Sequence, residues 1–289
     1  MNFNIDHLPA QTDSASSSPD SDHRFTVQRR EGVRLSTVDS GSRGSRENVL
    51  LFLHGWACDS ANFDAQLEHF EDRYRVIIPN LRGHGPSDAP PEGYALADFA
   101  DDLRWQLDDF GVKNAIVVGH SMGGNVGLEL AARDAGRISG LLMIDSVVFP
   151  GRDIRDGLKT AGQRLNLEGL DAALAELAPL LFIAEDDSNL SAEIRRRMTM
   201  TPDHVAVSAF RAHITDYDPG VTLANCDIPL GYIAAASPLA DLPLMRHLCP
   251  HLICAQTFAS GHFPQVFVPD QVNAMIERFV TLVEARARA

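Results

Sequence analysis

Residues 115–126 read Ala-Ile-Val-Val-Gly-His-Ser-Met-Gly-Gly-Asn-Val and contain the pattern G-x-S-x-G around Ser121. The apolar run Ala115 to Val118 leads into the pattern and is typical of a buried strand, and residues 122–133 have the spacing of a helix. A serine on a sharp turn between strand and helix stands clear of the backbone, provided that its neighbours are small. The segment therefore predicts a nucleophile turn with Ser121 at its apex. The alternative is a glycine-rich turn in which Ser121 only caps the helix.

Short apolar runs and helical spacing alternate on both sides of this segment. Runs of strand type lie at residues 49–53, 74–78, 141–144, 230–234 and 252–257, and helical patterns lie at 62–70, 96–110 and 270–286. Residues 25–29 and 33–38 predict an opening hairpin that turns at Glu31-Gly32. Strands that are apolar on both faces are typical of a parallel sheet covered by helices. We therefore expect an α/β fold with a mostly parallel central sheet flanked by helices.

A helical block without a convincing strand interrupts this alternation at residues 147–222. Its helical patterns lie at 167–181, 191–200 and 202–215. Such an insertion between two strands is expected to form a lid over the carboxyl edge of the sheet, where ligands bind. Residues 25–146 and 223–289 then make up the core. Residues 1–24 are rich in Ser, Asp and Pro, which favours a flexible leader, with a partner-docking tail as the alternative.

Composition limits the classes of partner and cofactor. The net charge is −14, whereas nucleic acids and anionic membrane surfaces select clustered Lys and Arg. No run of about 18 apolar residues occurs, and the first residues lack the pattern of a secretory signal, so neither a membrane span nor secretion is expected. The four cysteines show no metal-ligand spacing, and no nucleotide-binding pattern is present. We therefore expect free thiols, a cytoplasmic location, no metal and no cofactor.

Four pieces of the sequence together carry a resemblance to a known superfamily. They are His54-Gly55-Trp56, residues 80–88 (Asn-Leu-Arg-Gly-His-Gly-Pro-Ser-Asp), residues 119–124 and Gly261-His262-Phe263. With these pieces in this order, the chain from Phe25 to Arg286 resembles the α/β-hydrolase superfamily. The resemblance implies the hydrolase fold, a nucleophile, an acid and a histidine in that chain order, and an oxyanion hole.

A serine hydroxyl needs an adjacent base, and the chain has 11 histidines. His262 follows the last predicted strand, and its place after the nucleophile fits the hydrolase chain order. We therefore assign the base to His262, with an ordinary loop histidine as the alternative.

Five other histidines have less specific surroundings. His54 and His120 flank loop motifs and are expected to shape the backbone there, and His84 lies in a glycine-rich turn. His204 and His213 fall in the predicted lid. Either could contact a substrate, but solvated helix positions are favoured for both.

The acid departs from a common pattern of the superfamily. Many members resemble Gly-x-x-Asp after the strand that follows the lid, whereas this chain has Ala236 and Ser237 there. The first later carboxylate is Asp241.

The other known position for the acid is the end of the strand after the nucleophile helix. Asp145 directly follows that strand, 24 residues beyond Ser121, and can reach the same edge of the sheet. The histidine of a triad needs a group that fixes its tautomer, so we assign the acid to Asp145. A cap or turn at the lid entrance is the alternative role for Asp145, and Asp241 and Asp218 are the reserve candidates.

An oxyanion hole requires two preorganised N–H groups. One is expected from Met122, the residue after the nucleophile. The resemblance implies that the other comes from Trp56, whose ring could wall the pocket or pack under the lid.

Together these residues predict acyl transfer to water, with an apolar small-molecule ester or lactone as the substrate. A serine nucleophile argues against the epoxide hydrolase and dehalogenase branches. The spacing of 24 residues, the missing later acid and His262-Phe263-Pro264 are similar to zearalenone-type lactonases.

A second class of enzyme also resembles this chain. Cofactor-free quinolone dioxygenases share Gly55-Trp56, the Pro79-Asn80 pair with residues 82–85, and His262-Phe263-Pro264. In them a His–Asp pair deprotonates the substrate, and the serine need not be acylated. Met122 stands where that group resembles His-Ser-His. A ligand receptor on a hydrolase scaffold is the third hypothesis, and it rests on the fold alone.

Overall fold

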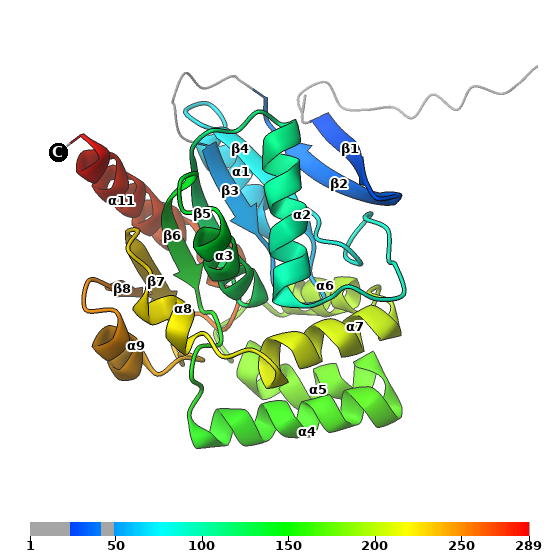
Figure 1. Cartoon of the computed structure of the whole chain (residues 1–289). Coiled ribbons are helices and arrows are strands. Elements are labelled where there is room, and N and C mark those ends of the chain that lie inside the picture. The colour runs from blue at the N-terminus through cyan, green and yellow to red at the C-terminus, as the bar shows by residue number, and fades with distance from the viewer. Residues whose placement is uncertain (1–23, 42–48, 289) are drawn as a thin grey trace, which may run out of the picture.

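Eight strands form one sheet in the order β1-β2-β4-β3-β5-β6-β7-β8 (Figure 1). The computed structural model describes residues 24–41 and 49–288. The strands are β1 (Arg24–Arg30), β2 (Val33–Asp39), β3 (Val49–Leu53), β4 (Arg75–Pro79), β5 (Ala115–His120), β6 (Ile138–Ile144), β7 (Leu230–Ala234) and β8 (Ile253–Gln256). From β4 to β8 every neighbouring pair is parallel, whereas β1–β2 and β2–β4 are antiparallel. The expected mostly parallel sheet and the opening hairpin are confirmed.

The predicted leader, residues 1–24, lies outside the described residues except for Arg24, which begins β1.

Helices cover both faces of the sheet because the strands alternate their apolar side chains between the faces. Leu51 and Leu53 of β3 pack into the core under α2 (Leu96–Asp109) and α3 (Met122–Arg133). Leu50 and Phe52 pack into a second core under α1 (Asp64–Phe70) and α11 (Pro269–Ala287). The short helices η1 (Ser60–Phe63), α9 (Leu242–Leu248) and α10 (Pro264–Phe267) lie in the connections. Continuous apolar runs are thus what a sheet buried on both sides requires.

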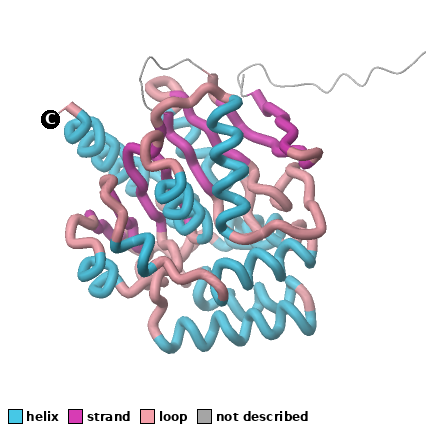
Figure 2. Tube along the Cα trace, viewed as in Figure 1, coloured by secondary structure: helices cyan, strands magenta, loops and turns pink. Residues whose placement is uncertain are grey.

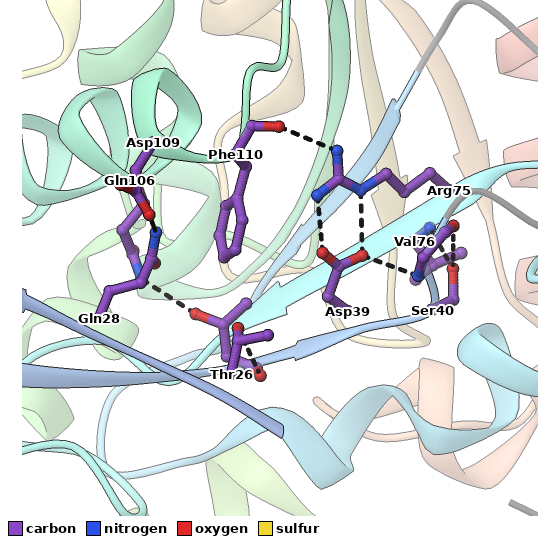
Figure 3. Close-up of polar contacts among 11 residues, drawn as sticks. Thr26, Gln28, Asp39, Ser40, Arg75, Val76, Gln106, Asp109 and Phe110 are labelled. Atoms are coloured by element: carbon purple, nitrogen blue, oxygen red, sulfur yellow. Dashed lines mark hydrogen bonds and ion pairs between the residues drawn. The ribbon is translucent and has the colours of Figure 1, made fainter. Parts of the chain in front are cut away.

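A polar network fixes the hairpin to the rest of the sheet (Figure 3). Arg75 of β4 binds the carboxylate of Asp39 through two nitrogens, at 3.0 and 2.7 Å, and donates a third bond to the carbonyl of Phe110. Gln106 of α2 donates to Gln28 of β1 at 3.0 Å. These bonds tie β1 and β2 to β4 and α2, at the edge remote from Ser121.

Residues 152–224 form an insertion between β6 and β7, which we call the cap. It contains α4 (Arg152–Glu168), α5 (Leu170–Leu181), α6 (Ser188–Met198), α7 (Asp203–Phe210), the π-helical turn η2 (Arg211–Thr215) and α8 (Gly220–Ala224). Figure 1 shows the cap on the side toward which the arrows of β5 and β6 point, and Figure 2 shows only helix and loop within it. The cap therefore lies at the carboxyl edge of the sheet.

The first cap helix differs from the sequence prediction, which began a helix only at residue 167. In the structure α4 starts at Arg152 and ends at Glu168, and Gly169, with φ +91°, separates it from α5. Only Leu158, Ala161 and Leu165 of α4 are buried, so its apolar stripe is narrow and most of the helix is polar.

Candidate active site

Ser121 lies on a tight turn between the end of β5 and the start of α3. Its backbone has φ +52° and ψ −120°, a conformation that residues with a side chain rarely adopt. A Cβ on Gly119 would come within 2.6 Å of the Cα of Gly124, and one on Gly123 within 2.6 Å of the carbonyl oxygen of His54. The glycines at these positions therefore allow strand, turn and helix to approach closely enough to present the Ser121 side chain at the sheet edge.

His262 and Asp145 are in direct contact. Nδ1 of His262 lies 2.8 Å from Oδ2 of Asp145, and the two side chains are only 4% and 1% exposed. Asp145 stands at the end of β6 with φ +42°, and its N–H donates to the carbonyl of Ile233 in β7. The contact fixes Nδ1 as the protonated nitrogen, which leaves the Nε2 lone pair available.

The loop after β7, which has Ala236 and Ser237 in place of a carboxylate, supports the side chain of Asp145. The N–H groups of Ala235 and Leu239 donate to Oδ1 of Asp145, at 3.2 and 3.4 Å. The loop after β7 thus orients the carboxylate at β6 instead of supplying one.

The reserve candidates serve local turns. Asp241 caps α9 by accepting the N–H of Leu244, and Asp218 accepts the N–H of Gly220, both at 2.9 Å. Both residues are exposed, and the structure joins neither of them to His262.

Ser121 and His262 line one small cavity, which we call the chamber. Its lining also includes Gly55 and Trp56 from the core, and apolar cap residues: Leu158, Leu177, Leu180, Leu181, Met198, Phe210 and Ile214. The chamber has a volume of about 40 Å³. Among the bonds of the described residues, His262 is joined to Asp145 but not to the Ser121 hydroxyl. Hydrogen bonds to a nucleophile are often completed only when substrate binds.

The two predicted oxyanion donors flank Ser121. Met122 is the first residue of α3, where N–H groups have no partner within the helix and the helix dipole favours negative charge. Trp56 lies in the turn after β3, and its side chain also contacts the cap. The indole N–H donates to the carbonyl of Ala206 at 2.9 Å, and the ring packs edge-on against Phe210.

Three buried histidines hold loops around the site, a role that the sequence predicts for His54 and His120. His54 donates from Nδ1 to the carbonyl of Gly55 and accepts the N–H of Leu81 at Nε2. Nδ1 of His84 donates to a backbone carbonyl in its own turn, and Nε2 of His120 donates to the carbonyl of His262 at 2.7 Å. Burial lowers the pKa of His54 to about 3 and that of His84 to about 4, and it lowers the pKa of His120 well below its ordinary value. These imidazoles are neutral at physiological pH.

The two cap histidines differ from each other. His204 is exposed, as expected, and donates to the carbonyl of Pro90. The favoured solvated position is wrong for His213, which is 5% exposed and lines the chamber. The π-helical turn η2 directs it inward, and an extra residue in a helical turn is not visible in apolar spacing.

The cap is bonded directly to the loop that carries His262, a connection that the sequence did not indicate. Asp186, between α5 and α6, accepts the N–H of Gly261 at 3.0 Å and that of Ile183 at 2.9 Å. The N–H of His262 donates to the carbonyl of Leu181 at 2.9 Å. No sequence pattern links a carboxylate to a loop 75 positions away.

The described ranges contain neither a cluster of metal-ligating side chains nor a helix that could span a membrane. Over residues 24–41 and 49–288, no cluster of three or more His, Cys, Asp or Glu side chains could hold a metal ion. No helix of the same part of the chain is long and apolar enough to span a bilayer.

Comparisons with known proteins agree with the fold. A family model described as alpha/beta hydrolase fold matches residues 48–167. RutD of Caulobacter vibrioides, which is named as a carbamate hydrolase, is 31% identical over 267 residues, covering 89% of this chain and 98% of RutD. A 2-(acetamidomethylene)succinate hydrolase of Mesorhizobium japonicum is 31% identical over 164 residues, which cover 55% of this chain and 58% of that protein.

A solved structure extends the fold comparison to nearly the whole chain. The enol-lactonase from Burkholderia xenovorans LB400 superposes with a TM-score of 0.79 at 21% identity, covering 89% of this chain and 100% of that one. The sheet, the turn at Ser121 and the relatives thus agree: the chain belongs to the alpha/beta hydrolase fold family, and its relatives support a hydrolytic activity.

Proposed function

We infer that this protein is a serine hydrolase that cleaves a carboxylic ester or lactone through an acyl-enzyme. Ser121 is the nucleophile, His262 the base and Asp145 the orienting acid. The observation that carries the proposal is the buried contact of 2.8 Å between His262 and Asp145, beside a chamber that Ser121 also lines.

The first half of the reaction forms the acyl-enzyme. Ser121 Oγ attacks the carbonyl carbon while Nε2 of His262 takes its proton, and Asp145 stabilises the imidazolium. The N–H groups of Trp56 and Met122 bind the oxyanion of the tetrahedral intermediate. When this intermediate collapses, the bond to the alcohol oxygen breaks and His262 returns the proton to that oxygen.

The second half releases the acid. His262 takes a proton from water, the resulting hydroxide attacks the acyl carbon, and the Ser121 oxygen leaves as it recovers a proton. In a lactone the alcohol and the acyl group belong to one molecule, so a single hydroxy acid is released. Apolar cap residues exclude bulk water, which strengthens the electrostatic interactions in the chamber. We assign the cap the role of a lid that selects the substrate.

A labelling experiment tests the nucleophile. A fluorophosphonate probe should add its mass at Ser121, and Ser121→Ala should lower kcat for p-nitrophenyl butyrate by about a thousandfold or more, because the oxyanion hole alone gives only residual catalysis. The matched control is Ser208→Ala, on α7 and outside the chamber lining, which should keep both labelling and turnover. Unchanged hydrolysis by Ser121→Ala would contradict the proposal.

The same variants separate the competing functions. In a cofactor-free dioxygenase, Ser121→Ala would keep oxygen consumption with a hydroxyquinolone, while His262→Ala would lose it. A receptor would bind a ligand tightly with negligible turnover. The proposed hydrolase predicts neither the oxygen consumption nor the tight binding without turnover.

A further inference from the structure

A second cavity adjoins the chamber on its cap side. This outer groove has a volume of about 1020 Å³ and lies between α4, the end of α7, η2 and the residues that lead to α8. It shares five lining residues with the chamber: Val147, Leu158, Phe210, His213 and Ile214. The chamber itself, at about 40 Å³, has room for little more than one water molecule. A substrate attacked at Ser121 must therefore continue into the outer groove past this shared wall.

His213 is the single polar side chain of the shared wall. Nε2 is completely buried and has no hydrogen-bond partner among the described residues. Burial, and secondarily the nearby His262, lowers the pKa of His213 to about 3, so the ring is uncharged. A buried polar atom without a partner destabilises the fold unless a water or a ligand satisfies it. The ring thus lies where a substrate passes, with the hydrogen-bonding capacity of its Nε2 unused.

We propose that His213 is a specificity-determining residue that hydrogen-bonds an uncharged oxygen of the substrate, a hydroxyl, carbonyl or ether lying a few bonds from the scissile carbonyl. This inference rests on the proposed ester or lactone hydrolysis. It narrows the substrate to a neutral compound whose remaining chain occupies the outer groove.

The surroundings of His213 favour a neutral oxygen over a carboxylate. Its neighbours in the wall, Val147, Leu158, Phe210 and Ile214, offer no charge. A neutral imidazole supplies one N–H and one lone pair, which suit a hydroxyl or carbonyl group, but it does not compensate a buried negative charge. The basic side chains of the groove, Arg155, Lys159 and Arg211, are exposed.

Matched esters test the proposal. One series is p-nitrophenyl hexanoate and analogues in which one methylene at a time is replaced by an ether oxygen. The other is hexyl acetate with the same replacements, followed by acid release. The wild type should prefer one analogue over its parent ester by about tenfold in kcat/KM, the effect of one neutral hydrogen bond.

Variants of His213 should remove this preference without removing catalysis. His213→Phe should lose the tenfold preference, so that the oxygen analogue and its parent ester have kcat/KM values within about twofold of each other, whereas His213→Gln, which keeps a donor, should retain part of the preference. His213→Leu repeats the test with a smaller side chain if the Phe variant misfolds. His204 is the exposed histidine of the cap, so His204→Phe is the matched control. It should change neither the preference for the oxygen analogue nor the kcat/KM of the parent ester.

The outcomes distinguish this inference from the proposed function. If no oxygen analogue is preferred in either series, or if the preference survives in the folded Phe or Leu variant, the role of His213 is overturned while hydrolysis at Ser121 stands. If Ser121→Ala hydrolyses the parent esters normally, the proposed function fails first.

Discussion

Asp145 illustrates how one carboxylate serves two purposes through its two oxygens. Oδ2 contacts Nδ1 of His262, and Oδ1 accepts N–H groups from the loop after β7. The second set of bonds holds the carboxylate in place, so that the first can hold the imidazole.

Asp145→Asn should therefore keep the packing and lose activity. The amide can turn its NH₂ group toward His262 and stabilise the tautomer with the proton on Nε2, which cannot accept a proton from Ser121. We expect kcat to fall at least about a hundredfold. Asp241→Asn is the matched control, because asparagine caps a helix as well as aspartate does. Steady-state kinetics with a p-nitrophenyl ester check both, and near-normal turnover by Asp145→Asn would remove this residue from the triad.

The key residues differ in how far the sequence predicts them. Ser121 is the most legible, because strand, glycines and helix are all local to it. Asp145 could be named because it directly follows an apolar strand. His213 was misjudged, since the inward direction of its ring depends on the π-helical turn and on packing against α4.

At the scale of elements, hydrogen bonds and ring stacking connect the cap to the loop that carries His262. Asp186, between α5 and α6, accepts the N–H of Gly261, and Leu181, the last residue of α5, accepts that of His262. Phe182 stacks on Phe263 with the ring centroids 5.7 Å apart. A shift of this segment would move the imidazole of His262, so the loop that follows α5 positions this side chain.

Asp186→Ala tests this joint. Loss of the carboxylate frees the N–H of Gly261 and loosens the loop, and a small misplacement of a catalytic group is costly. We expect kcat to fall about tenfold with little change in KM, and Asp186→Asn to restore most of the loss because its amide oxygen still accepts. The neighbouring Asp187 only caps α6, so Asp187→Ala should lower stability by about 1 kcal/mol and leave kcat unchanged. Equal kinetic effects of the two alanine variants would refute a positioning role.

The elements were predictable where one physical signal dominates. The parallel strands were found within a few residues, because their apolar runs are buried on both faces. The start of α4 was not predicted, because the helix is mostly polar, contains Gly157 and Gly162 and buries only three of its positions. How the cap reaches the His262 loop depends on contacts between distant segments, which periodicity does not encode.

On the scale of the whole molecule, the cap and the α2–α3 face of the sheet share one apolar core. Leu158 and Leu174 of the cap belong to the same cluster as Leu51 and Leu103 of the core. Besides His262, four histidines are buried within or beside this assembly: His54, His84, His120 and His213. Burial lowers the pKa of each one below the ordinary value of 6.5.

These histidines should make the fold sensitive to mild acid. Below pH 6.5 these histidines bind protons in the unfolded chain but not in the folded chain. Their contribution to the free energy of unfolding is therefore complete above pH 6.5 and is lost as the pH falls toward about 3 to 4. Each such group contributes a slope of about 1.4 kcal/mol per pH unit to the free energy of unfolding. Urea unfolding at intervals between about pH 7 and about pH 5 should therefore show the uptake of more than one proton.

The slope can be assigned to individual groups by substitution. His213→Phe removes one buried histidine and should reduce the proton uptake on unfolding by about one, whatever it does to stability at neutral pH. His204→Phe removes an exposed histidine of the same cap and is the matched control, whose slope should equal that of the wild type. A slope that is the same in the wild type and in His213→Phe would mean that the folded protein binds this proton after all. The proposal that a neutral His213 hydrogen-bonds the substrate in the chamber wall would then be wrong as well.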